Sequence, residues 1–401
     1  MILRPDPECP EPPSFWLSRP RPVREVRYAV VGGGLVGLST AYWLSRSLPN
    51  GEASEVAVLE AGGIGERASG RNAGFLLTGS AEPLVELAKV VGEETALRFW
   101  ELSRENRELL RRELLDDAEG GGPPVECEFL PEGSWIASLD DPAAKAILES
   151  SAARLEAAGF ELRWVEGQEL VQASGSSGLG AALYQPRDGG LDPVALTRGI
   201  VRTGGFPVHT GVRVRSLEPA GDRVRLVADG GDWLAERVVV ALNAYSPELL
   251  PHLQGAVRPV RGQMLAMEPG ARPLRGVWYI EDGYQYLRQL PDGTLLLGGC
   301  RHHDRDREVG FAETPTEPIQ KALEEFLHQR FPAFSGRSVA RRWAGIMAFT
   351  DDGLPMIGEV PEVPGAIYAA GFNGHGLSLG FAAGRHLAHC AIEGAVTPLL
   401  P

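Results

Sequence analysis

The stretch Val30-Val31-Gly32-Gly33-Gly34-Leu35-Val36-Gly37-Leu38 decides the fold of this chain. An apolar run that begins at Val26 leads into it, and apolar residues continue at helical spacing from Leu35 to Arg46, as expected for a strand followed by a helix. A second apolar run, from Glu55 to Leu59, ends at Glu60. Strand, glycine-rich turn, helix, strand and terminal acid together predict a βαβ unit of Rossmann type that binds a dinucleotide.

Each glycine of the Gly-x-Gly-x-x-Gly pattern has a physical reason. Gly32 permits the tight turn, Gly34 lets the backbone approach a pyrophosphate, and Gly37 lets the helix pack close to the strand. The helix N-terminus offers free N–H groups and the positive end of its dipole to the phosphates. Glu60 is placed to accept hydrogen bonds from a ribose. The pattern alone does not separate FAD from NAD.

Composition narrows the class of protein. The chain has 401 residues, of which 43% are hydrophobic and 23% charged, as in soluble globular proteins of about two domains. A formal net charge of −14 argues against nucleic acid or an anionic membrane as partner. The four cysteines form no Cys-x-x-Cys pair, which disfavours a disulfide framework. We therefore expect a reducing, cytoplasmic compartment, no signal peptide and no membrane span.

The order of elements predicts two interleaved domains. Residues 1–26 are rich in proline and are expected to form an extended arm. Helical patterns at 83–117 and 142–158, apolar strands between 212 and 242, and a Pro291-Asp292-Gly293 hairpin turn follow the βαβ unit. The fold class is thus α/β with an α+β substrate domain, and the site would lie between the two domains. The predicted ranges are 27–80, 188–258 and 345–401 for a discontinuous cofactor domain, and 81–187 and 259–344 for an inserted antiparallel-sheet substrate domain.

Several segments resemble one known family. Residues 66–74 (Glu-Arg-Ala-Ser-Gly-Arg-Asn-Ala-Gly), 188–193 (Asp-Gly-Gly-Leu-Asp-Pro), 350–358 and 371–376 (Gly-Phe-Asn-Gly-His-Gly) are similar to the flavin-contacting blocks of the D-amino-acid oxidase (DAO) superfamily, which includes glycine and sarcosine oxidases. The resemblance runs from about Pro13 to Glu393. The N-terminal arm and residues 242–245 look most like the γ-glutamylputrescine oxidase branch.

The resemblance implies that the cofactor is FAD. Met347 falls near the position of the cysteine that attaches flavin covalently in the sarcosine-oxidase branch, so we expect non-covalent FAD. The helix that follows Gly376 would direct its N-terminal N–H groups toward negative charge on the reduced ring. The predicted cofactor-binding residues are Gly32, Gly34, Gly37, Glu60, Ser69, Arg71, Asn72, Gly74, Val214, Gly345, Gly371, Gly374, His375, Gly376 and Leu377.

Four side chains are candidates for the catalytic site. His375 is a candidate for proton transfer, with a flavin-contacting or structural role as the alternative. Alternation puts Tyr284 and Tyr286 on one face, as an aromatic wall for an alkylamine cation or as ordinary strand packing. Arg288 is the candidate anchor for a remote carboxylate, because the family's usual cationic anchors are replaced by Met347 and by Ser378.

We therefore expect an FAD-dependent oxidoreductase that oxidises the C–N bond of an amine or amino acid by hydride transfer to flavin. Water would hydrolyse the imine, and oxygen would reoxidise the flavin and yield hydrogen peroxide. The alternatives are an amine dehydrogenase with another electron acceptor, a flavin hydroxylase that uses NAD(P)H, and a non-catalytic FAD-binding protein. No metal is expected, because Cys300, His302, His303 and Asp304 lack a convincing ligand set. Assembly into a homo-oligomer stays open.

Overall fold

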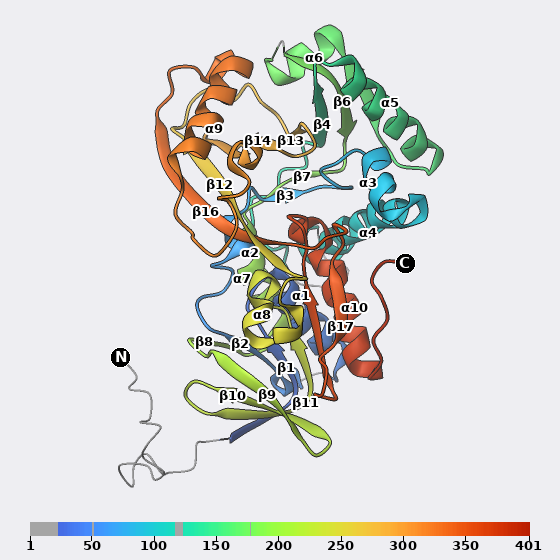
Figure 1. The fold of residues 1–401 in the computed structure, drawn as a ribbon, viewed down its shortest axis with the longest axis vertical. Helices are drawn as coiled ribbons and strands as arrows, with labels where there is room; N and C mark the ends of the chain where they lie inside the picture. Colours follow the sequence, from blue (N-terminus) through green and yellow to red (C-terminus); the bar gives the residue numbers. More distant parts are fainter. Residues whose placement is uncertain (1–22, 50–51, 117–122, 177) are drawn as a thin grey trace.

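The computed structural model describes residues 23–49, 52–116, 123–176 and 178–401. Most of the predicted proline-rich arm lies outside these ranges. Residues 23–26, assigned to the arm from sequence, instead belong to strand β1 (Val23–Val31). The chain forms two large sheets, one in the lower half and one in the upper half of Figure 1.

The first sheet is largely parallel and runs in the order β17-β18-β11-β1-β2-β8. Strand β1 lies between β2 and β11, and both pair with it in parallel. The second half of β1 and all of β2 except its last residue are buried, which explains their continuous apolar sequence. The other strands of this sheet are β2 (Val56–Glu60), β8 (Val208–Thr210), β9 (Val214–Ala220), β10 (Arg223–Ala228), β11 (Asp232–Val240), β17 (Met356–Glu359) and β18 (Ala366–Ala370).

Helices α1 (Leu35–Ser47) and α10 (Gly376–Glu393) pack against each other beside this sheet. A Cβ atom on Gly384 would lie 2.5 Å from the Cβ of Ser39, so the two helices meet where a larger residue would not fit. The indole of Trp43 donates to the Phe381 carbonyl at 3.1 Å. Three further helices surround this layer: α3 (Leu84–Val91), α4 (Glu93–Leu110) and α7 (Pro193–Gly204).

The second sheet runs in the order β16-β12-β15-β14-β13-β4-β6-β5, and only β13 and β4 pair in parallel. Helix α9 (Glu317–Arg330) packs on the face that carries Leu295 and Leu297. The strands are β4 (Ser134–Leu139), β5 (Arg163–Glu166), β6 (Leu179–Gln185), β12 (Arg258–Met267), β13 (Val277–Ile280), β14 (Gln285–Gln289), β15 (Leu295–Gly299) and β16 (Val339–Phe349), and helices α5 (Pro142–Ala157) and α6 (Gly167–Ser174) lie beside them.

Short elements join the two sheets. Strands β3 (Phe75–Leu76) and β7 (Gly189–Gly190) form a two-stranded ladder between them. The remaining short elements are helices α2 (Ala68–Arg71) and α8 (Ser246–Leu249), 3₁₀ turns at Ala53–Glu55, Asn243–Tyr245, Pro251–Leu253, Arg301–Asp304 and Pro332–Phe334, and a π-helical turn at Arg111–Leu115.

The predicted fold class, with a Rossmann-type sheet and an antiparallel second sheet, is confirmed. The hairpin turn is also confirmed: Gly293 has φ +86°, and the Thr294 N–H donates to Asp292 at 2.9 Å. The helical pattern at 83–117 is interrupted at Gly92 (φ +85°), which separates α3 from α4. The domain ranges stay a prediction, because α4, placed in the substrate domain, packs against α10.

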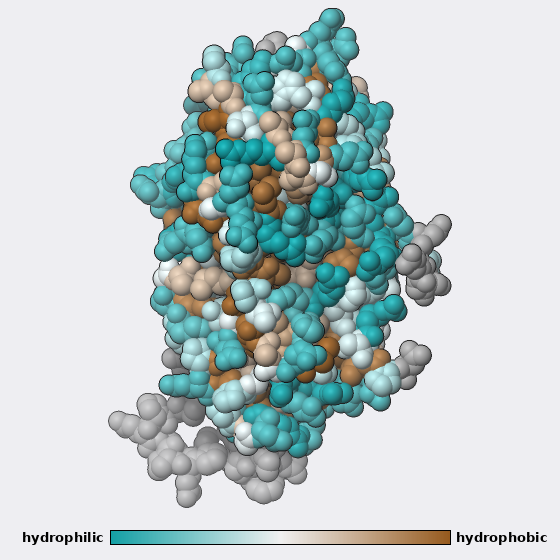
Figure 2. Space-filling model, turned by 90° about the vertical axis from the view of Figure 1, so that its right-hand side faces the viewer, coloured by the Kyte–Doolittle hydropathy of each residue, from teal (hydrophilic) through white to brown (hydrophobic). Residues whose placement is uncertain are grey.

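The surface carries few large exposed apolar side chains. The face in Figure 2 is mostly hydrophilic, with hydrophobic residues in separate patches. Within the described residues, no helix has the length and hydropathy needed to cross a bilayer.

Candidate active site

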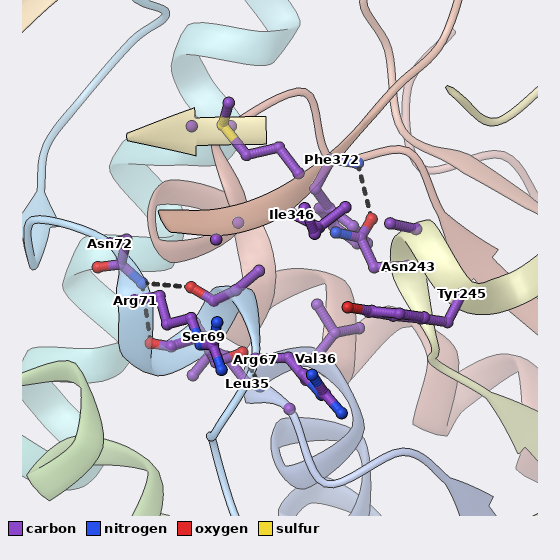
Figure 3. Close-up of a pocket in the computed structure, with 18 of the residues that line it drawn as sticks. Leu35, Val36, Arg67, Ser69, Arg71, Asn72, Asn243, Tyr245, Ile346 and Phe372 are labelled. Atoms are coloured by element: carbon purple, nitrogen blue, oxygen red, sulfur yellow. Dashed lines mark hydrogen bonds between the residues drawn. The ribbon is translucent and has the colours of Figure 1, made fainter. Parts of the chain in front are cut away.

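A cavity of about 670 Å³ is bordered by residues of both sheets. Figure 3 shows Leu35 and Val36 of α1, Ser69 and Arg71 of α2, Asn243 and Tyr245, and Ile346 and Phe372 around this space. The cavity thus lies between the two halves of the fold, where the sequence analysis expects the site.

The glycine-rich turn forms one end of the cavity. A Cβ atom on Gly32 would lie 2.6 Å from the Ala241 carbonyl oxygen, and one on Gly37 would lie 2.0 Å from the Gly32 carbonyl oxygen. A Cβ atom on Gly34 would have a single neighbour within 4 Å, the Ser69 hydroxyl at 3.1 Å. Gly32 and Gly37 are therefore required by the backbone itself, whereas Gly34 keeps space open in the cavity.

Polar groups surround this turn. Glu60 accepts from the Gly33 N–H and from the Gly62 N–H, both at 2.6 Å, so its carboxylate is fixed at the cavity wall. The Ser69 hydroxyl accepts from the Leu35 N–H at the first position of α1, at 2.8 Å. A hydroxyl and a helix N-terminus at one point suit phosphate oxygens.

The α2 segment is held in shape by its own side chains. Asn72 donates to the carbonyls of Ala68 and Ser69 at 3.0 and 2.8 Å (Figure 3). Arg71 donates to the Ala344 carbonyl at 3.0 Å and thereby joins α2 to β16. Its guanidinium also lies 2.9 Å from Glu313.

Glu313 connects three segments at the cavity wall. It pairs with Arg67 at 2.6 Å and with Arg71, and it accepts from the Tyr245 hydroxyl at 3.1 Å. Arg67, Arg71 and Tyr245 all line the cavity. Hydrogen bonding to Arg67 and the charges of both arginines overcome the effect of burial and lower the pKa of Glu313.

His375 lies at the other end, immediately before α10. Its Nε2 accepts from the Ala81 N–H at 2.9 Å, whereas Nδ1 is buried without a hydrogen-bond partner of normal geometry among the described residues. Burial lowers the pKa of His375, and the Glu82 charge and the Asn373 backbone oppose this only in part. The neutral ring therefore carries its proton on Nδ1, the nitrogen that remains for the Asn373 backbone.

An aromatic group stands beside this end of the cavity. The rings of Phe75, Tyr279 and Tyr286 lie 5.4 to 6.1 Å apart, with Tyr286 edge-on to the other two. Burial raises the pKa of Tyr286 to about 12 and raises that of Tyr279 as well. Tyr284 also lines the cavity, but its ring contacts His302 instead. The aromatic wall thus contains Tyr286 without Tyr284.

Most of the predicted cofactor-binding residues line this one cavity. Gly37, Gly74 and Gly371 do not line it, but at each of them a side chain would clash. The clash of Gly37 is described above. A Cβ atom on Gly74 would lie 2.0 Å from the Leu191 carbonyl oxygen, and one on Gly371 would lie 2.4 Å from Thr350. These three glycines shape the backbone around the site. The lining residues among those predicted are Gly32, Gly34, Glu60, Ser69, Arg71, Asn72, Val214, Gly345, Gly374, His375, Gly376 and Leu377.

The structure corrects the prediction for Arg288. Its guanidinium is buried outside the cavity lining and donates to the Leu191 carbonyl at 2.8 Å and, more weakly, to the Gly74 carbonyl at 3.4 Å. Burial lowers its pKa to about 10. Arg301, which the sequence analysis passed over, lines the cavity. Met347 and Ser378, the two neutral replacements, line it too.

The residues present fit FAD. Gly34 leaves room at the helix N-terminus for phosphates, and Gly374 leaves the far wall open, with its Cβ position no nearer than 3.6 Å to Met347. Gly345 lines the cavity where a Cβ atom would lie 3.0 Å from the Cβ of Arg71. His375 lines the same cavity. Glu60 would hold a ribose, and Ser69 a phosphate.

Comparison with known proteins supports this assignment. The family model described as FAD dependent oxidoreductase (DAO) matches residues 27–390. The chain is 27% identical over 382 residues to the probable oxidoreductase OrdL of Rhizobium meliloti strain 1021, covering 92% of this chain and 83% of that protein. It is 27% identical over 372 residues to γ-glutamylputrescine oxidoreductase of Escherichia coli strain K12, covering 90% and 82%.

The fold is also similar to that of L-proline dehydrogenase from P. horikoshii, with a TM-score of 0.75 at 21% identity, covering 93% of this chain and 95% of the other. Sequence motifs, fold and cavity agree with the family match over nearly the whole chain. The chain therefore belongs to the DAO family of FAD-dependent oxidoreductases.

Proposed function

We propose that this protein oxidises the C–N bond of an amine or amino acid. The observation that carries the proposal is the continuity of one cavity from the glycine-rich turn at Gly34 to a chamber with Tyr286 and His375 on its walls. A small substrate in that chamber would lie beside a cofactor whose phosphates sit at Gly34. Relatives named γ-glutamylputrescine oxidoreductase and glycine oxidase support this class of substrate.

FAD, when bound, supplies the ring that accepts a hydride from the carbon next to the substrate nitrogen and that oxygen then reoxidises. The side chains position the substrate and control protons. Tyr279 and Tyr286 keep their protons at neutral pH, because burial raises the pKa of both hydroxyls. Nε2 of His375 is occupied by the Ala81 N–H. None of these three groups removes a proton from the substrate, and on this proposal the amine reacts in its neutral form.

His375 then acts as a neutral hydrogen-bond donor through Nδ1. This role differs from the proton transfer considered from the sequence, because a neutral ring with an occupied Nε2 has no free lone pair. The aromatic chamber excludes water while the hydride leaves, and water hydrolyses the imine to a carbonyl compound and an amine or ammonia.

Anaerobic mixing of the purified protein with a panel of amines and amino acids tests the proposal. Loss of the flavin absorption band without NAD(P)H is the expected result. Admission of oxygen should then restore the band and produce hydrogen peroxide. If an artificial electron-accepting dye restores the flavin band and oxygen does not, the protein is a dehydrogenase. Bleaching that requires NAD(P)H, or no bleaching with any amine, would contradict the proposal.

A further inference from the structure

Arg301 occupies a defined position at the substrate end of the cavity. It follows β15 and opens a 3₁₀ turn, because Cys300 adopts φ +59° and donates its N–H to the Tyr284 carbonyl at 2.6 Å. The guanidinium carbon lies 4.6 Å from the ring centroid of Phe349 and 5.8 Å from that of Tyr284. Two aromatic rings therefore hold a planar cation at the cavity wall.

Within the described part of the chain, Arg301 is the arginine of this cavity that lacks an ion-pair partner. Each of the other four lining arginines, Arg67, Arg71, Arg213 and Arg215, pairs with an Asp or Glu. Among the described residues, no hydrogen bond or ion pair reaches the Arg301 guanidinium. Burial lowers its pKa, so the cation is held in a place where water solvates it poorly. A cation in such a place is stabilised by a bound anion.

We infer that Arg301 binds a carboxylate group of the substrate. The inference rests on the proposed amine oxidation and narrows its substrate class to amines that carry a carboxylate. A guanidinium packed against aromatic rings keeps its N–H edge available for two parallel hydrogen bonds to a carboxylate. The other two positions considered for such an anchor, Met347 and Ser378, offer no charge. The anion would therefore bind at the end of β15, and not at the positions of Met347 and Ser378.

Two carboxylates of the cavity narrow the class of substrate further. Glu82 and Asp282 also line the cavity, and neither pairs with Arg301 within the part of the chain that the structure describes. Both are exposed, although partial burial and the neighbouring carboxylates raise the pKa of Asp282, and the Glu82 charge acts on Arg301. They repel a second anion and attract an ammonium group as it enters. The substrate class that fits is an amine with a single carboxylate.

The first experiment measures binding without turnover. The protein with FAD bound is titrated with straight-chain carboxylates from propionate to hexanoate, and the change in the flavin spectrum gives Kd. We expect saturable binding that Arg301→Met weakens at least tenfold and Arg301→Lys weakens less. The matched control is Arg305→Met, since Arg305 lies 5.3 Å from the same Tyr284 ring but does not line the cavity. That variant should bind as the wild type does.

The second experiment compares aminocarboxylates of increasing chain length with their primary amides as substrates. We expect kcat/KM to favour the carboxylate at least tenfold, and Arg301→Met to remove that preference while the amides still react. A wild type that binds no carboxylate, or an Arg301→Met variant that keeps the preference, would overturn the inference. If no amine reduces the flavin but carboxylates bind through Arg301, the proposed function fails and the carboxylate site stands.

Discussion

Nε2 of His375 accepts a hydrogen bond from the backbone N–H of Ala81 at 2.9 Å. This bond connects the loop before α10 to the segment before α3. It forms only while Nε2 is unprotonated, so protonation of the ring breaks it and places a charge in a buried site. The folded structure therefore favours the neutral form of the His375 ring.

This relationship predicts a pH-dependent stability. Burial lowers the pKa of His375 in the folded protein, so below the ordinary value of about 6.5 the unfolded chain binds the proton more readily. The stability that neutral His375 contributes to the folded protein is complete above about pH 6.5, the ordinary pKa of histidine, and is lost as the pH falls below that value. Thermal unfolding should show a larger decrease in Tm between pH 7.5 and 5.5 for the wild type than for His375→Gln. His328→Gln, at an exposed position on α9, should follow the wild type.

The glycines of the first turn should separate cofactor binding from folding. Gly34→Val should abolish FAD binding and leave a folded apoprotein, because its Cβ position meets only the Ser69 hydroxyl. Gly37→Val should prevent folding, because its Cβ position lies 2.0 Å from a backbone oxygen. Flavin content and circular dichroism of both variants measure the difference. A Gly34→Val protein with full flavin content would show that the phosphate site is elsewhere.

FAD should be bound without a covalent link. Met347 lines the cavity and offers no thiol, and Cys300 is buried outside the lining, where burial raises its pKa to about 12. Acid precipitation of the yellow protein should leave the colour in the supernatant, and Cys300→Ser should behave identically. Colour that stays with the wild-type pellet and disappears from the Cys300→Ser pellet would identify a link to that sulfur.

Asp188 should be a major contributor to stability. It is fully buried and accepts from Arg107 at 2.6 Å, from Ser134 at 2.6 Å and from the Thr78 hydroxyl at 2.9 Å. Asp188→Ala removes the buried partner of the Arg107 cation, which keeps only the exposed Glu108, and should lower the free energy of unfolding by about 3–5 kcal/mol. The exposed pair of Glu161 with Arg187 serves as the control, since its loss should cost less than about 1 kcal/mol. Chemical denaturation compares Asp188→Ala with Glu161→Ala.

The sequence predicted the parts of the site that local backbone geometry determines. A turn that needs Gly32 and Gly37, followed by Glu60 at a strand end, is compatible with few folds. The family resemblance extended the prediction to Ser69 and Gly374. The FAD family and the fold were predicted correctly for that reason. Residues whose environment depends on strand pairing were harder to place.

Arg288 and Arg301 illustrate the difficulty. Alternation correctly puts Arg288 on the same face as Tyr286, but two residues along a strand is about 7 Å, which carries the guanidinium beyond the cavity to the Leu191 carbonyl. Arg301 comes after a strand, among histidines and charged residues, and its sequence is that of a surface turn. Only the pairing of β14 with β15 and the left-handed backbone of Cys300 bring it to the ring of Tyr284.

The contacts of Glu313 have a consequence for the lifetime of the holoprotein. One carboxylate holds Arg67, Arg71 and Tyr245 together, and all three line the cavity. A bound cofactor that leaves along this wall would have to separate these side chains first. Because the paired side chains are partly exposed, added salt weakens their ion pairs. We therefore expect cofactor release to become faster as ionic strength rises.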